Sequence, residues 1–326
     1  MDKLRWGILG TGSIAHKFAK GLVDLPEAEL VAVGSRSQSS AEAFGNEFGV
    51  THRHASYEDL ARDADVEAIY VATPHPLHYP NTRLCLEAGK HVLCEKPFTI
   101  NAGELAELIG LARERRRFLM EAMWPRFLPA MVQIRQLLAD GVIGTVQMLQ
   151  ADFGFRTQRN PEGRLFNPAL GGGALLDVGV YPVSLASMIF GQPDRIASLA
   201  QMGPTGVDEQ DAVILGYAGG QLATLGAAIQ TNTAQEARIL GTSGAIHIHA
   251  PWWQPRSYTL KRDGRPDEVV EVAFSGNGYN YEAAEVGRCI RGGLTESPTM
   301  PLDESLAIMQ TLDAIRSQWG LRYPME

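Results

Sequence analysis

The sequence of 326 residues has few cysteines and no excess of positive charge. Its three cysteines, Cys85, Cys94 and Cys289, are odd in number and not closely paired. They argue against a disulfide scaffold and for a reducing compartment. Lys and Arg number 29 against 37 Asp and Glu, a net charge of −8. A basic surface for nucleic acid or anionic lipid is therefore not expected, and a small soluble ligand is the better hypothesis.

Long apolar runs and leader-like segments are also missing. No uninterrupted apolar stretch approaches the roughly 20 residues of a membrane-spanning helix, and the N-terminus lacks the charged and then apolar layout of a signal peptide. Hydrophobic residues make up 45% and charged residues 20%, which excludes a disordered, collagen-like or coiled-coil chain. We therefore expect a globular cytoplasmic protein that does not bind a membrane.

The first part of the chain alternates short apolar runs with helical stretches. The first run, Leu4–Leu9, is followed by helices expected near 13–25, 41–48, 78–88 and 102–115, with further apolar runs between them. Strands that are apolar at nearly every position and separated by helices are typical of a parallel sheet covered on both faces. Residues 1–122 therefore predict an α/β domain with a Rossmann-like, doubly wound parallel sheet that binds a dinucleotide.

From about residue 125 the pattern changes to glycine-rich and proline-rich breaks between alternating segments. The segments 145–156, 195–202, 211–218, 221–229, 236–242 and 245–250 read as antiparallel strands. Gly219-Gly220 predicts a hairpin between two of them. Helices are expected near 182–190 and 302–319. Residues 123–326 therefore predict a second, α+β domain on a large, mostly antiparallel, open-faced sheet.

A glycine-rich turn follows the first strand directly. Its residues are Gly10, Thr11, Gly12, Ser13, Ile14 and Ala15. In this pattern one glycine makes the tight turn, the next lets the backbone approach a pyrophosphate, and Ala15 permits close helix packing. The N-terminus of the following helix offers unpaired N–H groups to the phosphates. The turn predicts dinucleotide binding, although alone it could be purely structural.

The end of the second strand indicates which dinucleotide is bound. A site that prefers NAD usually has Asp or Glu there for the ribose hydroxyl, but this chain has Ser35, Arg36 and Ser37. Arg36 can face a 2′-phosphate, with Ser35 and Ser37 as small donors. NADP is therefore the expected cofactor, with NAD possible if Arg36 is only an exposed loop residue.

Three further motifs resemble a known family. They are Thr73-Pro74-His75-Pro76-Leu77-His78, a strand ending in Glu95-Lys96-Pro97, and the block from Gly171 to Pro182. Together they closely resemble the Gfo/Idh/MocA family of NAD(P)-dependent oxidoreductases, over nearly the whole chain. With Glu121–Phe127, the block resembles the branch of dimeric dihydrodiol dehydrogenases and NADP-dependent xylose dehydrogenases.

Hydride transfer from an alcohol needs a group that removes the hydroxyl proton. Many family members carry His where this chain has Tyr181, so the resemblance implies the tyrosine variant of the mechanism. A tyrosine titrates near pH 10, and the ammonium of Lys96 would favour its ionised form. Asp177 lies four residues before Tyr181 and by resemblance orients substrate or catalytic groups. It could also be an N-cap.

The resemblance also assigns binding residues. It places Thr73, Pro74 and His78 beside the nicotinamide, with Glu95 in the signature motif and His75 at the substrate. Trp124, Phe153 and Trp253 would form an aromatic substrate wall, although each could equally be core. Arg126 could meet either a substrate hydroxyl or the cofactor.

No metal site is expected. His75 and His78 form an HxxH pair, but no cysteine or carboxylate set with ligand spacing accompanies them. His247 and His249 alternate on a predicted strand and are interpreted as structural.

These observations predict an NADP-dependent oxidoreductase acting on a hydroxyl of an aldose, a cyclic polyol or a trans-dihydrodiol, with Lys96 and Tyr181 as the acid–base pair. The alternatives are a reductase of keto- or anhydro-sugars and a cofactor-binding sensor without turnover. The resemblance implies a homodimer through the open sheet face, unless the chain's own helices cover that face.

Overall fold

The computed structural model describes residues 3–326, which form two compact units. The first comprises the chain up to Phe127 together with Ser275–Leu306, and the second comprises Leu128–Phe274 and Ala307–Glu326. The predicted division at residues 122 and 123 does not include this return of residues 275–306 to the first unit, and it stays a prediction.

A six-stranded parallel sheet forms the centre of the first unit, in the order β3-β2-β1-β4-β5-β6. Its strands are β1 (Leu4–Leu9), β2 (Ala28–Gly34), β3 (His52–His54), β4 (Ala68–Val71), β5 (His91–Glu95) and β6 (Leu119–Ala122). The inner strand β4 and the edge strand β6 are buried at every position, as expected where both faces are covered. The strand order reverses between β1 and β4, which is where doubly wound sheets bind ligands.

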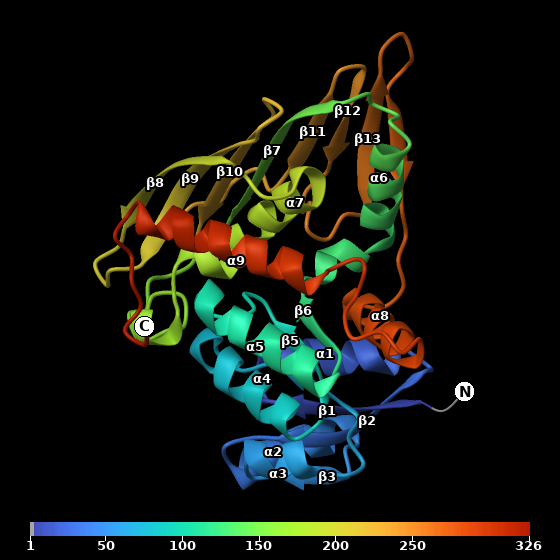
Figure 1. The fold of residues 1–326 in the computed structure, drawn as a ribbon, viewed down its shortest axis with the longest axis vertical. Helices are drawn as coiled ribbons and strands as arrows, with labels where there is room; N and C mark the ends of the chain where they lie inside the picture. The colour runs from blue at the N-terminus through green and yellow to red at the C-terminus, as the bar shows by residue number, and fades with distance from the viewer. Residues whose placement is uncertain (1–2) are drawn as a thin grey trace. The chain divides into compact units, whose positions relative to one another are not determined.

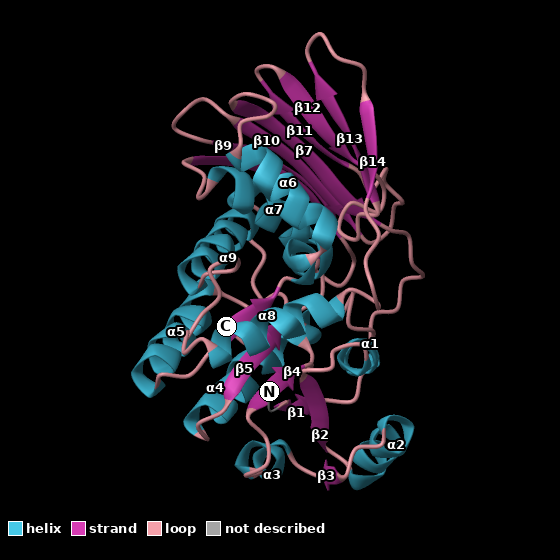
Figure 2. Ribbon diagram, turned by 90° about the vertical axis from the view of Figure 1, so that its right-hand side faces the viewer, coloured by secondary structure: helices cyan, strands magenta, loops and turns pink. Residues whose placement is uncertain are grey.

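Helices cover both faces of this sheet. They are α1 (Ser13–Val23), α2 (Gln38–Phe48), α3 (Tyr57–Arg62), α4 (His78–Glu87), α5 (Ala102–Arg115) and α8 (Tyr279–Arg291). Figure 2 shows α3, α4 and α5 on one side of the sheet and α1 and α2 on the other, and α8 packs on α1. Ser37, Ser56 and Asn101 cap the helices α2, α3 and α5 through their side-chain oxygens, which explains where these helices begin.

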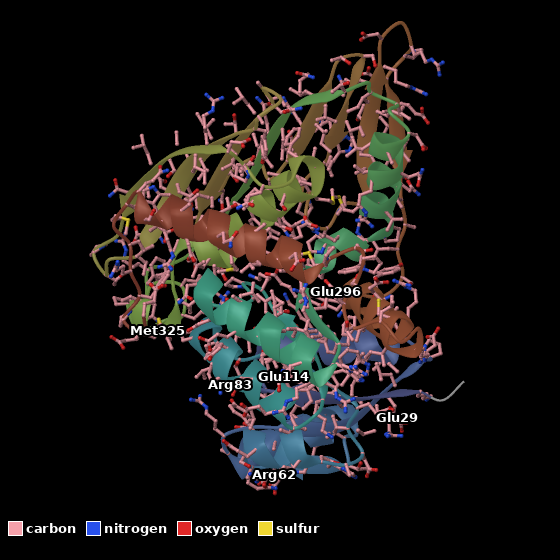
Figure 3. The ribbon with its side chains drawn as sticks, viewed as in Figure 1. Glu29, Arg62, Arg83, Glu114, Glu296 and Met325 are labelled. Carbon is pink, nitrogen blue, oxygen red and sulfur yellow. The ribbon has the colours of Figure 1, made fainter. Side chains whose placement is uncertain are left out.

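Aromatic rings fill the core beneath the first helix, and charged side chains cover its surface. Phe18 of α1 stacks on Tyr70 of β4, with ring centroids 3.8 Å apart. The outer helices present exposed charged residues such as Arg62, Arg83 and Glu114 (Figure 3). This division of apolar and charged residues is that of an ordinary globular domain.

The second unit is built on an eight-stranded sheet in the order β14-β13-β12-β11-β7-β10-β9-β8. Its strands are β7 (Val146–Gly154), β8 (Arg195–Met202), β9 (Asp208–Gly216), β10 (Leu222–Ala228), β11 (Ala237–Gly241), β12 (Gly244–Ile248), β13 (Ser257–Arg262) and β14 (Glu268–Glu271). Only the pairing of β7 with β10 is parallel among these described strands. The predicted fold class is therefore confirmed. The predicted hairpin joins β9 to β10, through a turn from Tyr217 to Gln221.

Helices lie on one face of this sheet (Figure 1). They are α6 (Pro129–Ala139), α7 (Val180–Phe190) and the part of α9 (Leu302–Ser317) from Ala307 onward. Helix α7 packs on β7 and β10, and a π-helical turn, Leu175–Gly179, leads into it and packs on β10.

By length and composition alone, one helical stretch of the described residues is apolar enough to cross a membrane. It is Pro168–Phe190, with a mean hydropathy of 1.6 over its most apolar window. The sequence-based expectation concerned an uninterrupted apolar stretch, and it is not contradicted, because Asp177 and the glycines 171–173 interrupt this one. The window is 83% buried within the protein, which is typical of the core helix of a globular domain.

Candidate functional site

The glycine-rich turn has the backbone geometry that a pyrophosphate site needs. Gly10 has φ +110°, and a Cβ there would lie 2.9 Å from the carbonyl oxygen of Ala72. Gly12 is the N-cap of α1, and a Cβ there would meet no atom within 4 Å. Gly10 is therefore required by the fold. The fold itself does not require Gly12, which keeps open the space where a ligand's phosphates would approach the helix.

A pocket of about 570 Å³ opens beside this turn. It lies at the carboxyl ends of the first, second and fourth strands, and its lining consists of Gly10, Thr11, Gly12, Ser35, Arg36, Ser37, Ser40, Tyr57, Ala72, Thr73 and Pro74. Ser13 and Ile14 form the first turn of α1 at its edge. The structure thus brings together most of the predicted cofactor-binding residues, in a space large enough for the adenosine and phosphate part of a dinucleotide.

The far end of the pocket carries a cation and several hydroxyl groups. The exposed Arg36 hydrogen-bonds to the hydroxyl of Tyr57, while Ser37 caps α2 and bonds to Ser40 at 2.8 Å. Burial raises the pKa of Tyr57 and the Arg36 guanidinium opposes this shift, so Tyr57 stays a neutral donor at neutral pH. No carboxylate is among the residues described as lining the pocket. This end therefore fits an anionic group.

Sequence reasoning missed Tyr57 and Ser40. Ser40 has a weak signal, since it lies in the first turn of the helix that Ser37 caps. Tyr57 has almost none, because the strand before it, His52–His54, is only three residues long and carries no apolar pattern.

His78 fixes the two loops that follow β4 and β5. It is fully buried, with Nδ1 2.7 Å from the carbonyl oxygen of Pro97 and Nε2 2.8 Å from that of Thr73. Burial lowers its pKa to about 4, although both carbonyls oppose the shift, so near pH 7 the neutral ring carries one N–H and donates to one of the two carbonyls. Asn81 donates to the Thr73 hydroxyl at 3.1 Å. The predicted nicotinamide loop is thus held in place by His78 and Asn81.

Lys96 follows the fifth strand, as predicted. Its side chain is half-buried, whereas Glu95 before it points into the core. The Glu95 carboxylate accepts a hydrogen bond from the Tyr70 hydroxyl and one from the backbone N–H of Lys96. The buried Glu95 therefore stabilises the turn that carries Lys96 by accepting the hydrogen bond from its backbone N–H. Its assignment as a cofactor-binding residue stays a prediction.

Three other predicted residues of the first unit have contacts within that unit. Trp124 is buried and stacks on Tyr279 of α8, with ring centroids 4.9 Å apart. Arg126 is buried and donates to the Glu304 carboxylate at 2.6 Å. His75 is half-buried beside His78. Their roles at the substrate stay predictions, and Arg126 is already paired with a carboxylate.

The second unit brings three predicted aromatic residues together. Phe153 of β7 stacks on Trp253 with centroids 3.3 Å apart, and the ring of Tyr181 lies 5.3 Å from Phe153. Tyr181 extends from the first turn of α7 and is 8% exposed. A phenol at the edge of an apolar wall suits a substrate with one reacting hydroxyl and an apolar ring face.

Asp177 lies in the π-helical turn before α7 and is buried. One of its oxygens accepts a hydrogen bond of 2.5 Å from Arg164. The interpretation of Asp177 as an N-cap is wrong, because the helical turn already begins two residues earlier, at Leu175. Arg164 was not predicted, since it lies in an irregular loop without periodic signal.

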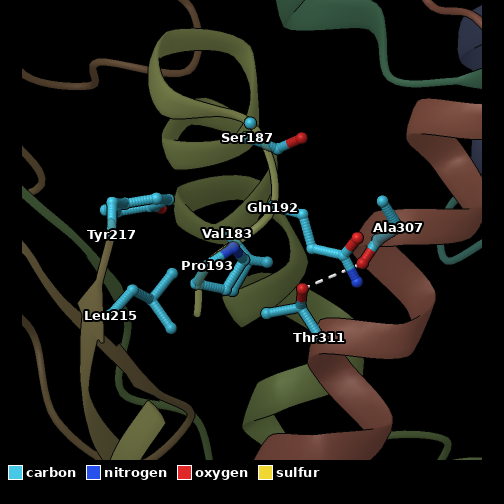
Figure 4. A pocket seen from close by; sticks show the side chains of 9 residues that line it. Val183, Ser187, Gln192, Pro193, Leu215, Tyr217, Ala307 and Thr311 are labelled. Atoms are coloured by element: carbon cyan, nitrogen blue, oxygen red, sulfur yellow. Dashed lines mark hydrogen bonds between the residues drawn. The ribbon is translucent and has the colours of Figure 1, made fainter. Parts of the chain in front are cut away.

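A second small gap does not qualify as a site. It lies between α7, β9 and the later part of α9, where Thr311 donates to the Ala307 carbonyl at 2.8 Å (Figure 4). The gap leaves no room for a water molecule and is a packing defect.

Two family models match this chain. Residues 4–123 match the oxidoreductase family with an NAD-binding Rossmann fold, and residues 131–247 match the GFO/IDH/MocA C-terminal domain. The two matches fall on the parallel sheet and on the large mixed sheet.

Several relatives match over nearly their full length. The chain is 40% identical to trans-1,2-dihydrobenzene-1,2-diol dehydrogenase of Mus musculus over 99% of both chains, and 38% identical to that of Homo sapiens over the same shares. Among solved structures, the aldose-aldose oxidoreductase of Caulobacter crescentus has a TM-score of 0.89 at 25% identity, covering 98% of each chain. The 3-ketoreductase KijD10 of Actinomadura kijaniata, solved with NADP and TDP-benzene, has a TM-score of 0.87 at 26% identity, covering 97% of this chain and 98% of that one.

The dinucleotide pocket, the two family matches and the full-length dehydrogenase relatives agree. The chain is an NAD(P)-dependent oxidoreductase that acts on the hydroxyl groups of small molecules of the sugar or diol class. It belongs to the GFO/IDH/MocA oxidoreductase family.

Proposed function

We propose that this enzyme is an NADP-dependent dehydrogenase of a trans-dihydrodiol or of an aldose or related cyclic polyol. The observation that carries the proposal is the placement of the Tyr181 phenol beside the stacked rings of Phe153 and Trp253. A flat apolar wall next to one acid–base group fits a ring that bears hydroxyls on its edge. The dihydrodiol dehydrogenase relatives, about 40% identical, support the diol as the first substrate to test.

The pocket of the first unit supports NADP over NAD. Arg36 and the hydroxyl groups of Ser35, Ser37 and Ser40 line the end where an adenosine 2′-phosphate would lie. A carboxylate there would repel that phosphate, and the described lining has none. The ketoreductase structure with NADP is consistent with this preference.

In the proposed mechanism Tyr181 removes the proton of the reacting hydroxyl and returns it in the reverse reaction. Lys96 supplies a positive charge that favours the ionised phenol and orients the hydroxyl. The residues that line the dinucleotide pocket would hold NADP, which would supply the hydride acceptor for the oxidation. Solved variants of the ketoreductase include replacements of one lysine and of one tyrosine, which supports testing this pair.

A substrate panel followed by NADPH absorbance tests the proposed function. The panel contains trans-dihydrodiols of benzene, D-xylose, D-glucose and cyclic polyols, each with NADP and with NAD, and the keto products with NADPH. We expect oxidation of a diol or aldose with a higher kcat/KM for NADP. Turnover confined to keto- or anhydro-sugars would make the enzyme a reductase, and tight NADPH binding without any turnover would make it a sensor.

We also propose a cytoplasmic homodimer formed through the open face of the large sheet. Leu199 is 81% exposed and Ile214 is 49% exposed, and both lie on neighbouring strands of this sheet. Leu199 of β8 is paired with Ala212 of β9, and Ala212 is paired with Gly226 of β10. Small apolar residues therefore extend the exposed apolar surface across these three strands. Such a flat apolar patch suits contact with the same patch of a second copy.

A further inference from the structure

Two histidines and an aspartate converge at the edge strand of the parallel sheet. His52 and His54 are two residues apart on β3, so their side chains lie on the same face of the strand. Asp63 is the C-cap residue of the following helix, α3. Nδ1 of His52 lies 2.7 Å and Nε2 of His54 lies 2.9 Å from the same oxygen, Oδ2 of Asp63. None of the three lines the dinucleotide pocket.

The Asp63 carboxylate is held in a fixed orientation. Its side chain is 7% exposed, and its other oxygen accepts a hydrogen bond of 2.9 Å from the backbone N–H of Asp65. The Asp63 backbone carbonyl is itself fixed by the ammonium of Lys90, which also donates to Val66. These contacts therefore fix the position of the Asp63 oxygen that faces the two imidazole rings.

His52 has a second carboxylate partner. Its Nε2 lies 3.7 Å from Asp65, on the side of the ring away from Nδ1. Metal-binding histidines usually direct their second ring nitrogen to a carboxylate, which fixes the tautomer and raises the basicity of the ligating nitrogen. The outer group of such an arrangement is already present.

We propose that His52, His54 and Asp63 bind one zinc ion, with water completing the coordination. Two imidazole nitrogens and one carboxylate oxygen suit Zn²⁺, whereas Mg²⁺ and Ca²⁺ prefer oxygen ligands alone. The three ligand atoms lie within 4.8 Å of one another, and bonds of about 2.0–2.1 Å place tetrahedral ligands about 3.3 Å apart. Only small side-chain movements are therefore needed.

The protons balance without another reactant. In the zinc complex each imidazole binds through the nitrogen that carries no proton, and its one proton sits on the opposite ring nitrogen. Bound zinc ties β3 to the end of α3, and Tyr57 at the start of that helix lines the dinucleotide pocket. The site therefore stabilises the part of the fold beside the pocket.

Zinc titration of the untagged, chelator-treated enzyme tests the site, with zinc alone as the probe and an indicator dye as competitor. We expect one tight zinc per chain, and an affinity at least about 100-fold weaker in His52→Gln and in His54→Gln, since even outer-shell changes cost 10–100-fold. The matched control is His247→Gln, which removes a histidine paired with Glu236 at 2.9 Å and should leave the affinity unchanged. Circular dichroism and NADPH binding show that each variant is folded.

X-ray absorption of the zinc-loaded wild type keeps the proposal testable even if both variants misfold. We expect nitrogen and oxygen neighbours at about 2.0–2.1 Å, an imidazole signature and no sulfur shell. The proposal is overturned if no stoichiometric zinc binds, if sulfur ligates the metal, or if the folded variants bind zinc as the wild type does.

Discussion

Arg36 is the residue on which cofactor preference depends. It is exposed at the end of the pocket, it hydrogen-bonds there to the neutral Tyr57, and no described lining residue carries a negative charge. A charge-assisted contact to a phosphate contributes about 1.5–3 kcal/mol, or roughly one to two orders of magnitude in affinity.

Arg36→Asp should therefore lower the ratio of kcat/KM for NADP to that for NAD by at least about tenfold, because it replaces the attraction with repulsion. Steady-state kinetics with both cofactors measure this ratio. Arg62→Asp is the matched control, since Arg62 is exposed on α3 but does not line the pocket. An unchanged ratio in Arg36→Asp would remove this residue from the cofactor site.

The site residues that could be predicted are those with a local sequence signal. Gly10 and Gly12 belong to a contiguous motif, and Arg36 follows a clear strand. Tyr57 reaches the same pocket from about 20 residues further along, after a strand too short to show periodicity. Arg164 contacts Asp177 from an irregular loop, and only tertiary folding brings the two together.

At the scale of elements, the turn from β1 to α1 contains one glycine that the fold requires and one that we assign to ligand binding. Gly10 needs its positive φ and its close approach to Ala72, whereas a Cβ on Gly12 has open space around it. The two glycines therefore have different roles, although they belong to one motif.

Gly10→Ala should lower the free energy of unfolding by about 1–3 kcal/mol, because it adds backbone strain and a clash with a carbonyl oxygen. Gly12→Ala should unfold at nearly the wild-type temperature yet bind NADPH at least about tenfold more weakly. Thermal unfolding and NADPH titration on both variants give the two readouts. The assignment fails if Gly12→Ala binds NADPH normally.

The alternation of strands and helices was sufficient to predict the doubly wound sheet and most strands of the large sheet. Two of the missed elements lack a clear pattern: β3 has three polar residues, and β14 is exposed or half-buried at every position. The helices α3, α6 and α8 and the strands β6 and β13 were also not predicted. The π-helical turn at Leu175–Gly179 depends on a partner distant in sequence, because Asp208 of β9 accepts a hydrogen bond of 2.6 Å from the Leu175 N–H. No local rule identifies such a cap.

For the whole molecule, buried carboxyl groups make stability depend on pH. Asp208 is completely buried, and burial raises its pKa to about 7 although the Leu175 N–H opposes the shift. An unfolded Asp titrates near about 3.9. Between these values the folded state holds a proton that the unfolded state has lost, so the free energy of unfolding falls as the pH rises through this window.

Asp208→Asn should remove this dependence, because an amide has the same shape and does not ionise. Relative to wild type, the variant should gain roughly 2–4 kcal/mol in the free energy of unfolding as the pH rises from about 4 to about 8. Urea unfolding across this range measures the difference. A constant difference between the two proteins would show that Asp208 does not titrate in this window.

The proposed homodimer is also a property of the whole molecule. Leu199→Asp introduces a charge into the exposed apolar face of the large sheet and should convert the dimer to a monomer. Val23→Asp is the control, since Val23 is 79% exposed but lies at the end of α1 in the first unit. Sedimentation velocity reports the mass. A monomeric wild type would contradict the proposal.

The rate of NADPH formation by Tyr181→Phe at saturating NADP and diol or aldose tests the catalytic proposal most directly. Loss of a general base predicts a fall in kcat of roughly 10²–10⁴-fold with unchanged NADPH affinity. Tyr217→Phe, which removes a buried hydroxyl without a hydrogen-bond partner in the described structure, should keep the wild-type rate. A Tyr181→Phe enzyme that turns over as fast as the wild type would contradict the assignment of this phenol as the group that moves the proton.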